Sequence, residues 1–102
     1  MARLVVMYKK PADAKAFDSH YFDKHIPLAK TIPGLRRYDV SKGAIMTPQG
    51  PSQWHLIATL HFDGMAGIAA AFASAEGKKT AADLANFAQA GVEMAMFEDQ
   101  QV

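Results

Sequence analysis

The sequence predicts a single α+β domain in which a four-stranded sheet carries its helices on one face. Three observations lead to this fold class. Short runs rich in β-branched and aromatic residues alternate with segments whose apolar residues recur at helical spacing. Their order along the chain is β-α-β-β-α(α)-β, without a detectable internal repeat. The 102 residues are enough for one domain and too few for two, so we expect residues 1–102 to form one unit.

The first half of the chain is predicted to form a strand, a helix and a second strand. The first strand covers residues 3–8, and Asp13 is placed to cap the helix that follows. The buried stripe of this helix consists of Ala14, Phe17 and Tyr21. Pro27 disfavours a helical conformation at the residue before it, so the helix should end near His25. A Pro-Gly turn then leads into the second strand, which runs to about Val40.

The third strand, residues 53–62, has two faces of different character. One face is wholly apolar and consists of Trp54, Leu56, Ala58, Leu60 and Phe62. The other face is mixed and consists of His55, Ile57, Thr59 and His61. The apolar face belongs under the helices. The other sheet face also carries either Val5 and Met7 or Leu4 and Val6, which is a large patch to leave in water. We therefore predict a homodimer in which a second copy stacks on this open face.

The second half of the chain is predicted to hold two helices and the last strand. Residues 46–53 contain two prolines and a glycine and are predicted to form a loop. Asp63 can cap a helix that ends near Gly77. The inward residues of this helix are Met65, Ile68, Ala69 and Phe72. A further helix over residues 78–89 turns Leu84, Phe87 and Ala88 inward, with Gly91 as its C-terminal cap. Residues 92–98 form the fourth strand.

Composition and charge narrow the classes of function. Eleven basic and ten acidic residues leave a net charge of +1, so we expect no nucleic-acid partner and no binding to an anionic membrane. There is no cysteine, no secretory signal and no apolar run long enough to span a bilayer, which predicts a cytoplasmic protein. The glycines do not form a phosphate-binding loop, so we expect no nicotinamide or flavin cofactor.

Three motifs tie the chain to a known family. They are His-x-Pro-Leu at residues 25–28, Pro-Gly-Leu-Arg at 33–36 and Asp-Leu-x-Asn-Phe at 83–87. The sequence resembles the EthD-like family, named for ethyl tert-butyl ether degradation, over nearly its whole length. The resemblance implies a ferredoxin-like domain with a four-stranded antiparallel sheet that pairs sheet to sheet as a dimeric α+β barrel. The wider superfamily includes cofactor-independent monooxygenases of polycyclic aromatic compounds, muconolactone isomerases, haem-degrading enzymes and proteins without known activity, so it leaves the reaction open.

The four histidines do not predict a metal site. On an α-helix, His20 and His25 are about 140° apart and point in different directions. His55 and His61 share one face of a strand but are separated by about 20 Å. Neither pair can share one ion. A site made from both helix and strand stays possible, but nothing in the spacing indicates it.

His25 is the candidate for proton transfer. It lies four residues after Tyr21, so the two side chains are neighbours on one helix face. The helix C-terminus favours the protonated imidazole, and burial against aromatic rings favours the neutral one. A histidine balanced in this way can act as a general acid or base near neutral pH. The alternative is that His25 only hydrogen-bonds the carbonyl groups at the helix end. His20 has polar neighbours and is expected to be a solvated residue.

Aromatic residues and one further histidine are the candidates for substrate binding. We place Tyr8, Tyr21, Tyr38 and His61 around His25. The tyrosine rings can instead simply fill core volume, and His55 and His61 can be polar residues of the dimer interface. Either Arg36 or Arg37 could hold an anionic oxygen, and the sequence does not decide between them.

These residues predict a small-molecule enzyme with an apolar, aromatic-lined pocket between the sheet and the first helix. The reaction expected is cofactor-independent oxygenation or isomerisation of an aromatic or enolisable compound, with His25 moving the proton. The second hypothesis is a non-catalytic accessory or carrier protein that binds an apolar metabolite. The third is a purely structural dimer.

Overall fold

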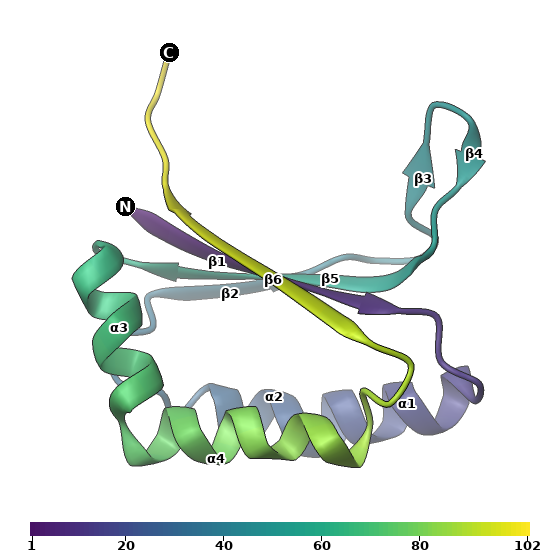
Figure 1. The fold of residues 1–102 in the computed structure, drawn as a ribbon, viewed down its shortest axis with the longest axis horizontal. Helices are drawn as coiled ribbons and strands as arrows, with labels where there is room; N and C mark the ends of the chain where they lie inside the picture. Colours follow the sequence, from purple (N-terminus) through teal and green to yellow (C-terminus); the bar gives the residue numbers. More distant parts are fainter.

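The computed structural model describes all 102 residues and arranges them in two layers, a sheet and a set of helices on one side of it (Figure 1). The sheet contains β1 (Ala2–Lys9), β2 (Arg37–Val40), β5 (Trp54–Phe62) and β6 (Val92–Glu98). Their order is β2-β5-β1-β6, and every neighbouring pair is antiparallel. The predicted fold class is therefore confirmed. None of the helices has the length and apolar character needed to cross a membrane.

The first helical segment is longer than predicted. It consists of α1 (Ala14–His20), a π-helical turn η1 (Tyr21–His25) and α2 (Ile26–Ala29). The Asp13 cap is confirmed, since its carboxylate accepts from the Ala16 N–H at 3.0 Å. The predicted helix end near His25 is wrong. Pro27 occupies the first turn of α2, where its missing N–H costs no hydrogen bond, and the helix continues after the π turn.

The residues that begin and end the helices of the second helical segment differ from those predicted. It consists of α3 (Met65–Ala73), α4 (Ala75–Asp83) and a short 3₁₀ turn, η2 (Leu84–Asn86). Asp63 does not cap α3, because its carboxylate pairs with Arg36 at 2.7 Å. The chain leaves the helix at Ser74 rather than at Gly77, and the Ser74 hydroxyl caps α4 by accepting from the Gly77 N–H at 3.0 Å.

Gly77 has a packing role inside α4. A Cβ at this position would lie only 1.9 Å from the carbonyl oxygen of Ala71, so only glycine allows α3 and α4 to meet this closely. Gly91, predicted as a cap, has a φ of +126° in the turn that leads into β6, beyond the end of η2. The predicted loop holds a small hairpin of β3 (Met46–Thr47) and β4 (Gly50–Pro51) that projects from the domain (Figure 1).

The core lies between the sheet and the helices. The apolar face predicted for β5 points into it from Leu56 to Phe62, with Leu56, Ala58, Leu60 and Phe62 buried. Trp54, predicted for the same face, lies beyond a shift in the pairing with β1, is half-buried and does not belong to the core. β1 contributes every second residue in the same way, namely Ala2, Leu4, Val6 and Tyr8. The helical layer closes the core with Phe17, Tyr21, Ile68, Ala71 and Phe87. Ala14 and Ala69, both predicted to face inward, are exposed.

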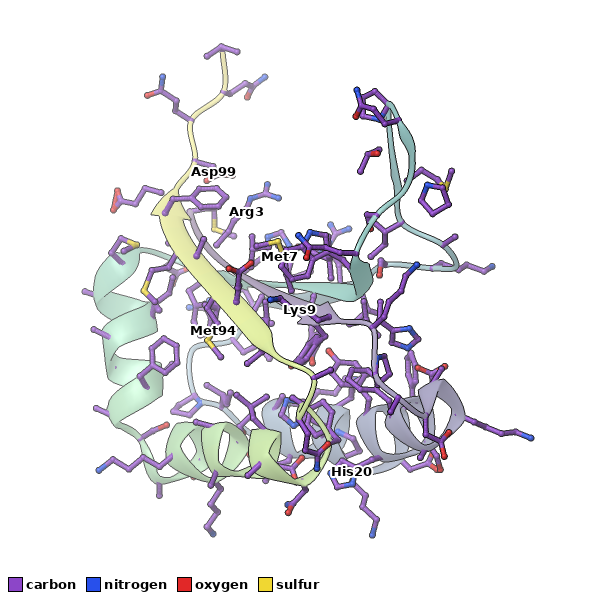
Figure 2. The ribbon with its side chains drawn as sticks, turned by 45° about the vertical axis from the view of Figure 1, so that its right-hand side comes forward. Arg3, Met7, Lys9, His20, Met94 and Asp99 are labelled. Atoms are coloured by element: carbon purple, nitrogen blue, oxygen red, sulfur yellow. The ribbon has the colours of Figure 1, made fainter.

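The second face of the sheet is not covered by any helix. It carries Val5, Met7 and Ile57, all half-buried, and Met7 pairs directly with Ile57 across the two strands. Of the two alternatives left by the sequence, the structure therefore places Val5 and Met7 on this face. Met7 and Met94 point to opposite sides of the sheet (Figure 2). The homodimer through this open face stays a prediction.

Candidate active site

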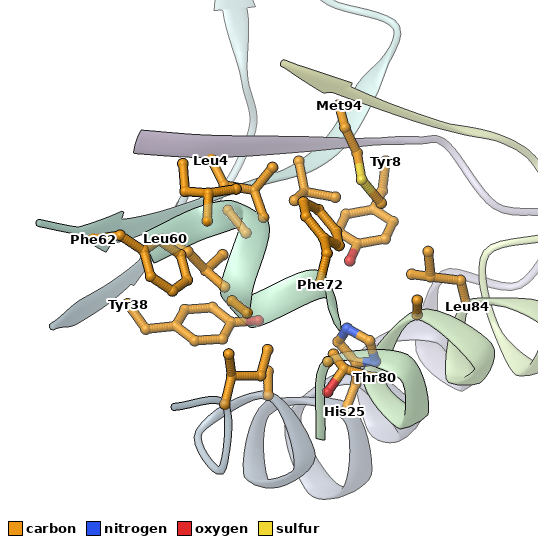
Figure 3. A pocket seen from close by; sticks show the side chains of 18 residues that line it. Leu4, Tyr8, His25, Tyr38, Leu60, Phe62, Phe72, Thr80, Leu84 and Met94 are labelled. Atoms are coloured by element: carbon orange, nitrogen blue, oxygen red, sulfur yellow. The ribbon is translucent and has the colours of Figure 1, made fainter. Parts of the chain in front are cut away.

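A largely apolar cavity of about 60 Å³ lies between the sheet and the helices (Figure 3). Fifteen of its eighteen lining residues are hydrophobic, so any polar group among them determines what can bind. Its wall includes Leu4, Val6, Leu60, Phe62, Ile68 and Leu84. Of the predicted site residues, Tyr8, His25 and Tyr38 line it. The cavity thus lies where the sequence predicted a pocket, next to the first helical segment.

His25 is held in one orientation and is only 3% exposed. Its Nδ1 atom lies 2.8 Å from Oδ2 of Asp83. Because a carboxylate only accepts hydrogen bonds, Nδ1 carries the proton and Nε2 carries the lone pair. The imidazole packs against the rings of Tyr21 at 5.4 Å and Phe87 at 4.7 Å. The alternative in which His25 hydrogen-bonds carbonyl groups at the helix end is wrong, because its partner is Asp83.

The protonation state of His25 suits a base. Burial lowers its pKa below the usual value, and the hydrogen bond and charge of Asp83 only partly oppose this effect. The imidazole is therefore neutral at neutral pH, with Nε2 free of any hydrogen bond within the chain. A proton taken up by Nε2 would create an imidazolium ion that the Asp83 carboxylate stabilises.

His20 shares the same carboxylate, which the sequence did not predict. Its Nε2 atom lies 2.9 and 3.0 Å from the two oxygens of Asp83. The expectation that His20 and His25 point in different directions is wrong because η1 is a π turn. Its hydrogen bonds join residues five apart, so it brings His20 and His25 to the same side of the helix. His20 is also not fully solvated, since its side chain is 22% exposed and stacks on Phe87 at 5.1 Å.

Asp83 connects the two helical segments at this site. It ends α4 and accepts hydrogen bonds from both histidines and from the Asn86 side chain at 2.9 Å. Burial alone would raise the pKa of Asp83, but the hydrogen bonds from Asn86, His25 and His20 outweigh it and hold the pKa below its usual value. Asp83 is therefore ionised. Although several titratable groups meet here, no three such side chains are arranged to hold a metal ion.

The three tyrosines take different positions around the cavity. The hydroxyl groups of Tyr21 and Tyr38 are hydrogen-bonded to each other at 2.6 Å, and Tyr21 lies behind Tyr38 rather than on the cavity wall. Tyr8 lines the cavity, is 2% exposed, and makes no side-chain hydrogen bond within the chain. Burial raises the pKa of all three phenols, so they are neutral and can donate hydrogen bonds.

His61 does not line this cavity, so its predicted place in the pocket is wrong. Leu60 and Phe62 point into the cavity, and the residue between them must point to the opposite face of the sheet. There Nε2 of His61 lies 3.0 Å from a carboxylate oxygen of Asp39, a residue that also pairs with Arg37 at 2.9 Å. The predicted oxyanion role finds no support either, since Arg36 and Arg37 are both exposed and neither lines the cavity.

His55 also differs from its prediction. It was placed on the open sheet face, but its Nε2 atom lies 2.7 Å from Asp18 of α1 and its ring meets Phe17 at 4.9 Å. The reason is a shift in the pairing of β1 with β5 between Tyr8 and Lys9, which disturbs the alternation beside His55. His55 and Asp18 thus form a further histidine–carboxylate pair outside the cavity.

The residues that hold the two histidines belong to one motif, and sequence reasoning did not assign them to the site. Asp83, Asn86 and Phe87 lie within Asp-Leu-x-Asn-Phe, and together they hold His20 and His25. The model of the EthD domain matches residues 9–91, which contain this motif and His-x-Pro-Leu. The chain belongs to the EthD domain family.

The relatives of this EthD chain extend over its whole length. A Rhodococcus erythropolis protein, described as an uncharacterized 11.0 kDa protein in the thcB-thcC intergenic region, is 44% identical over 99% of this chain and 96% of its own length. The crystal structure of an EthD family protein from Bacillus halodurans has a TM-score of 0.90 at 33% identity, covering 98% of this chain and 99% of that one.

A second solved structure shows the fold in a protein with a described activity. SnoaB, a cofactor-independent oxygenase from Streptomyces nogalater, has a TM-score of 0.68 at 15% identity, and the match covers 99% of this EthD chain and 94% of SnoaB. At this identity the likeness concerns the fold alone.

Proposed function

We propose that this EthD protein is a small-molecule enzyme in which His25 moves a proton within an apolar cavity. The observation that carries the proposal is the pairing of His25 Nδ1 with Asp83 at 2.8 Å, because it leaves Nε2 as the basic atom beside the cavity. The reaction proposed is oxygenation or isomerisation, without a cofactor, of an apolar aromatic or enolisable compound.

The groups around His25 support this chemistry. A neutral imidazole that is buried and paired with a carboxylate is the usual arrangement of a histidine general base. Removal of a C–H proton by Nε2 leaves a carbanion, which can take the proton back at another carbon or react with molecular oxygen. The second of these outcomes gains support from SnoaB, a cofactor-independent oxygenase with the same fold.

Replacement of His25 tests the proposal directly. His25→Gln is expected to slow deuterium exchange or turnover of enolisable and anthrone-type test compounds by roughly 10²- to 10⁴-fold, the usual contribution of a general base. His55→Gln is the matched control, because His55 makes an equivalent contact with Asp18 outside the cavity. Unchanged rates in a folded His25→Gln protein would remove His25 as the base.

The apolar character of the cavity favours one alternative, a carrier or accessory protein that binds an apolar metabolite. Fifteen hydrophobic lining residues provide binding without any need for a titrating group. Measurement of the His25 pKa by NMR, with and without a bound test compound, separates the two functions. A pKa that the compound does not change, together with no proton exchange, would favour the carrier.

We further propose that two copies pair through the open sheet face. The half-buried apolar residues Val5, Met7 and Ile57 lie there without a covering helix. Ile57→Lys is expected to give a folded monomer by sedimentation velocity. A dimer that persists in this variant would place the interface elsewhere.

A further inference from the structure

We infer that the cavity takes a compact apolar molecule with one carbonyl oxygen, which the Tyr8 hydroxyl binds while His25 faces the adjacent C–H group. This inference rests on the proposed function, in which His25 is the base. Two observations support it: which polar groups on the cavity wall already have hydrogen-bond partners, and how large the cavity is.

Most polar groups of the cavity wall already have partners. The Thr80 hydroxyl donates to the Glu76 carbonyl at 2.8 Å, and the Tyr38 hydroxyl is paired with Tyr21 at 2.6 Å. Nδ1 of His25 is paired with Asp83. Two polar atoms are left without a partner in the chain, namely the Tyr8 hydroxyl and Nε2 of His25. A ligand can therefore pair with both of these atoms without breaking a hydrogen bond of the chain.

The Tyr8 hydroxyl is directed at the open space of the cavity. Tyr8 is 2% exposed, yet no side-chain polar atom that is sealed inside the protein lacks a partner. The unpaired oxygen must therefore border the cavity, and Figure 3 shows the Tyr8 hydroxyl on the His25 side of its ring. A ligand acceptor that displaces water from this small apolar cavity would satisfy a donor that has no partner in the chain.

The chemistry of these two atoms defines the ligand. Tyr8 stays protonated and donates, so the ligand atom facing it is an acceptor. Nε2 of His25 accepts, so the ligand group facing it releases a proton. A ketone or aldehyde with a hydrogen on the neighbouring carbon meets both conditions. A charged ligand fits poorly, because no arginine or lysine lines the cavity and an unpaired buried ion is strongly disfavoured.

Cavity size restricts the ligand further. On a scale where one water molecule needs about 10–15 Å³, the cavity of about 60 Å³ holds roughly four to six non-hydrogen atoms. Phe72 and Met94 line it and are 37% and 41% exposed, so they form its mouth. A polycyclic compound can enter only if these two side chains move outward, whereas a small cyclic ketone needs no such movement.

The reaction step at this site balances without an oxidant or reductant. Nε2 of His25 takes the proton from the carbon next to the carbonyl. The electron pair of the broken C–H bond forms the carbon–carbon double bond of an enolate, and the carbonyl oxygen takes the negative charge. The Tyr8 hydroxyl holds that oxygen by a hydrogen bond, and His25 then returns the proton to carbon.

The test compares cyclopentanone with methylenecyclopentane, a hydrocarbon of nearly the same shape, by NMR titration. Tyr8→Phe is expected to lower the affinity for the ketone roughly 2- to 13-fold, the value of one hydrogen bond, and to leave the hydrocarbon unchanged. Thr59→Val removes a hydroxyl from the opposite sheet face and should change neither affinity. An unchanged ketone affinity in a folded Tyr8→Phe protein would overturn the inference.

Two further measurements distinguish a failure of this inference about Tyr8 from a failure of the proposed function of His25. In the wild-type protein, the hydrogen bond should lower the carbonyl stretching frequency of bound cyclopentanone, and an unshifted band would overturn the role of Tyr8 even if Tyr8→Phe does not fold. Deuterium exchange of the ketone in D₂O reports on His25. Binding that depends on Tyr8 without exchange that depends on His25 would refute the proposed enzyme and keep the ligand class.

Discussion

Replacing Asp83 by Asn is expected to lower the pKa of His25 by about 1–3 pH units. The carboxylate lies 2.8 Å from Nδ1 of His25, and a charge of opposite sign within about 4–6 Å shifts a pKa by this amount. Water screens the pair little, because the two side chains are 4% and 12% exposed. One pH unit corresponds to about 1.4 kcal/mol, so the variant loses about 1.4–4 kcal/mol of imidazolium stabilisation.

An NMR titration of the histidine side chains measures this effect without a substrate. Asp18→Asn is the control, since Asp18 pairs with Nε2 of another histidine, His55, at 2.7 Å and lies outside the cavity. Asp83→Asn should lower the pKa of His25, and Asp18→Asn should leave it unchanged. The imidazole nitrogen shifts of the wild type should also show the proton on Nδ1 of His25.

The direction of the change in the His25 pKa shows whether Asp83 stabilises the protonated imidazole. Burial already holds the pKa of His25 below its usual value, and Asp83 opposes that effect. Without the charge, burial acts alone and the imidazole stays neutral to still lower pH. The acidic limb of the rate profile should move to lower pH, and the plateau rate should fall because the base is weaker. A pKa of His25 that is unchanged or higher in Asp83→Asn would refute this reasoning.

Three further predictions follow from single contacts and are measured by urea unfolding or NMR. Gly77→Ala should lower the free energy of unfolding by about 1–3 kcal/mol, because its Cβ would meet the Ala71 carbonyl. Gly67→Ala is the control: its Cβ would make only ordinary contacts, so the free energy of unfolding should rise by up to about 1 kcal/mol. Equal effects of the two substitutions would contradict the close approach of α3 and α4 at Gly77. His20→Gln should raise the pKa of His25, since a charged His20 opposes protonation of its neighbour, and a fall would contradict this. Because the folded-state pKa of His25 is lowered, the unfolded chain binds more protons just below pH 6.5, and stability falls as pH drops through that range. His25→Gln should lose less stability there, and equal losses would exclude His25 as the cause.

The strands could be predicted well because the alternation of inward and outward residues repeats every two positions and does not depend on which residue caps the element. In β5 the alternation placed Leu60 and Phe62 in the core, and the same alternation put His61 on the far face, where the structure has it. The helix ends were predicted less well. Asp63 and Ser74 are both good caps by type, and the choice between them depends on tertiary contacts such as the pairing of Asp63 with Arg36.

The site was predicted only in part, for a reason of geometry. His25 was named because its helical spacing from Tyr21 turns it toward the sheet, and Tyr8 and Tyr38 because they are aromatic residues of the first two strands; all three line the cavity. The connection between His20 and His25 was missed because a helix of 3.6 residues per turn separates them by about 140°. A π turn cannot be read from residue spacing. Asp83, which joins the two histidines, lies 58 residues away from His25 in the sequence.

Two of the three family motifs, His-x-Pro-Leu and Asp-Leu-x-Asn-Phe, therefore act as one structural unit rather than as independent signatures. His-x-Pro-Leu supplies His25, the proposed base, and its Pro27 takes a position in the first turn of α2 where no backbone N–H is needed. This lets the helix restart directly after the π turn, which keeps His20 and His25 on the side that faces Asp83. Asp-Leu-x-Asn-Phe supplies the carboxylate that fixes the imidazole and the Phe87 ring that both histidines contact. Pro27 is itself exposed, so its part in the site is exerted through the winding of the backbone and not through any contact with a ligand.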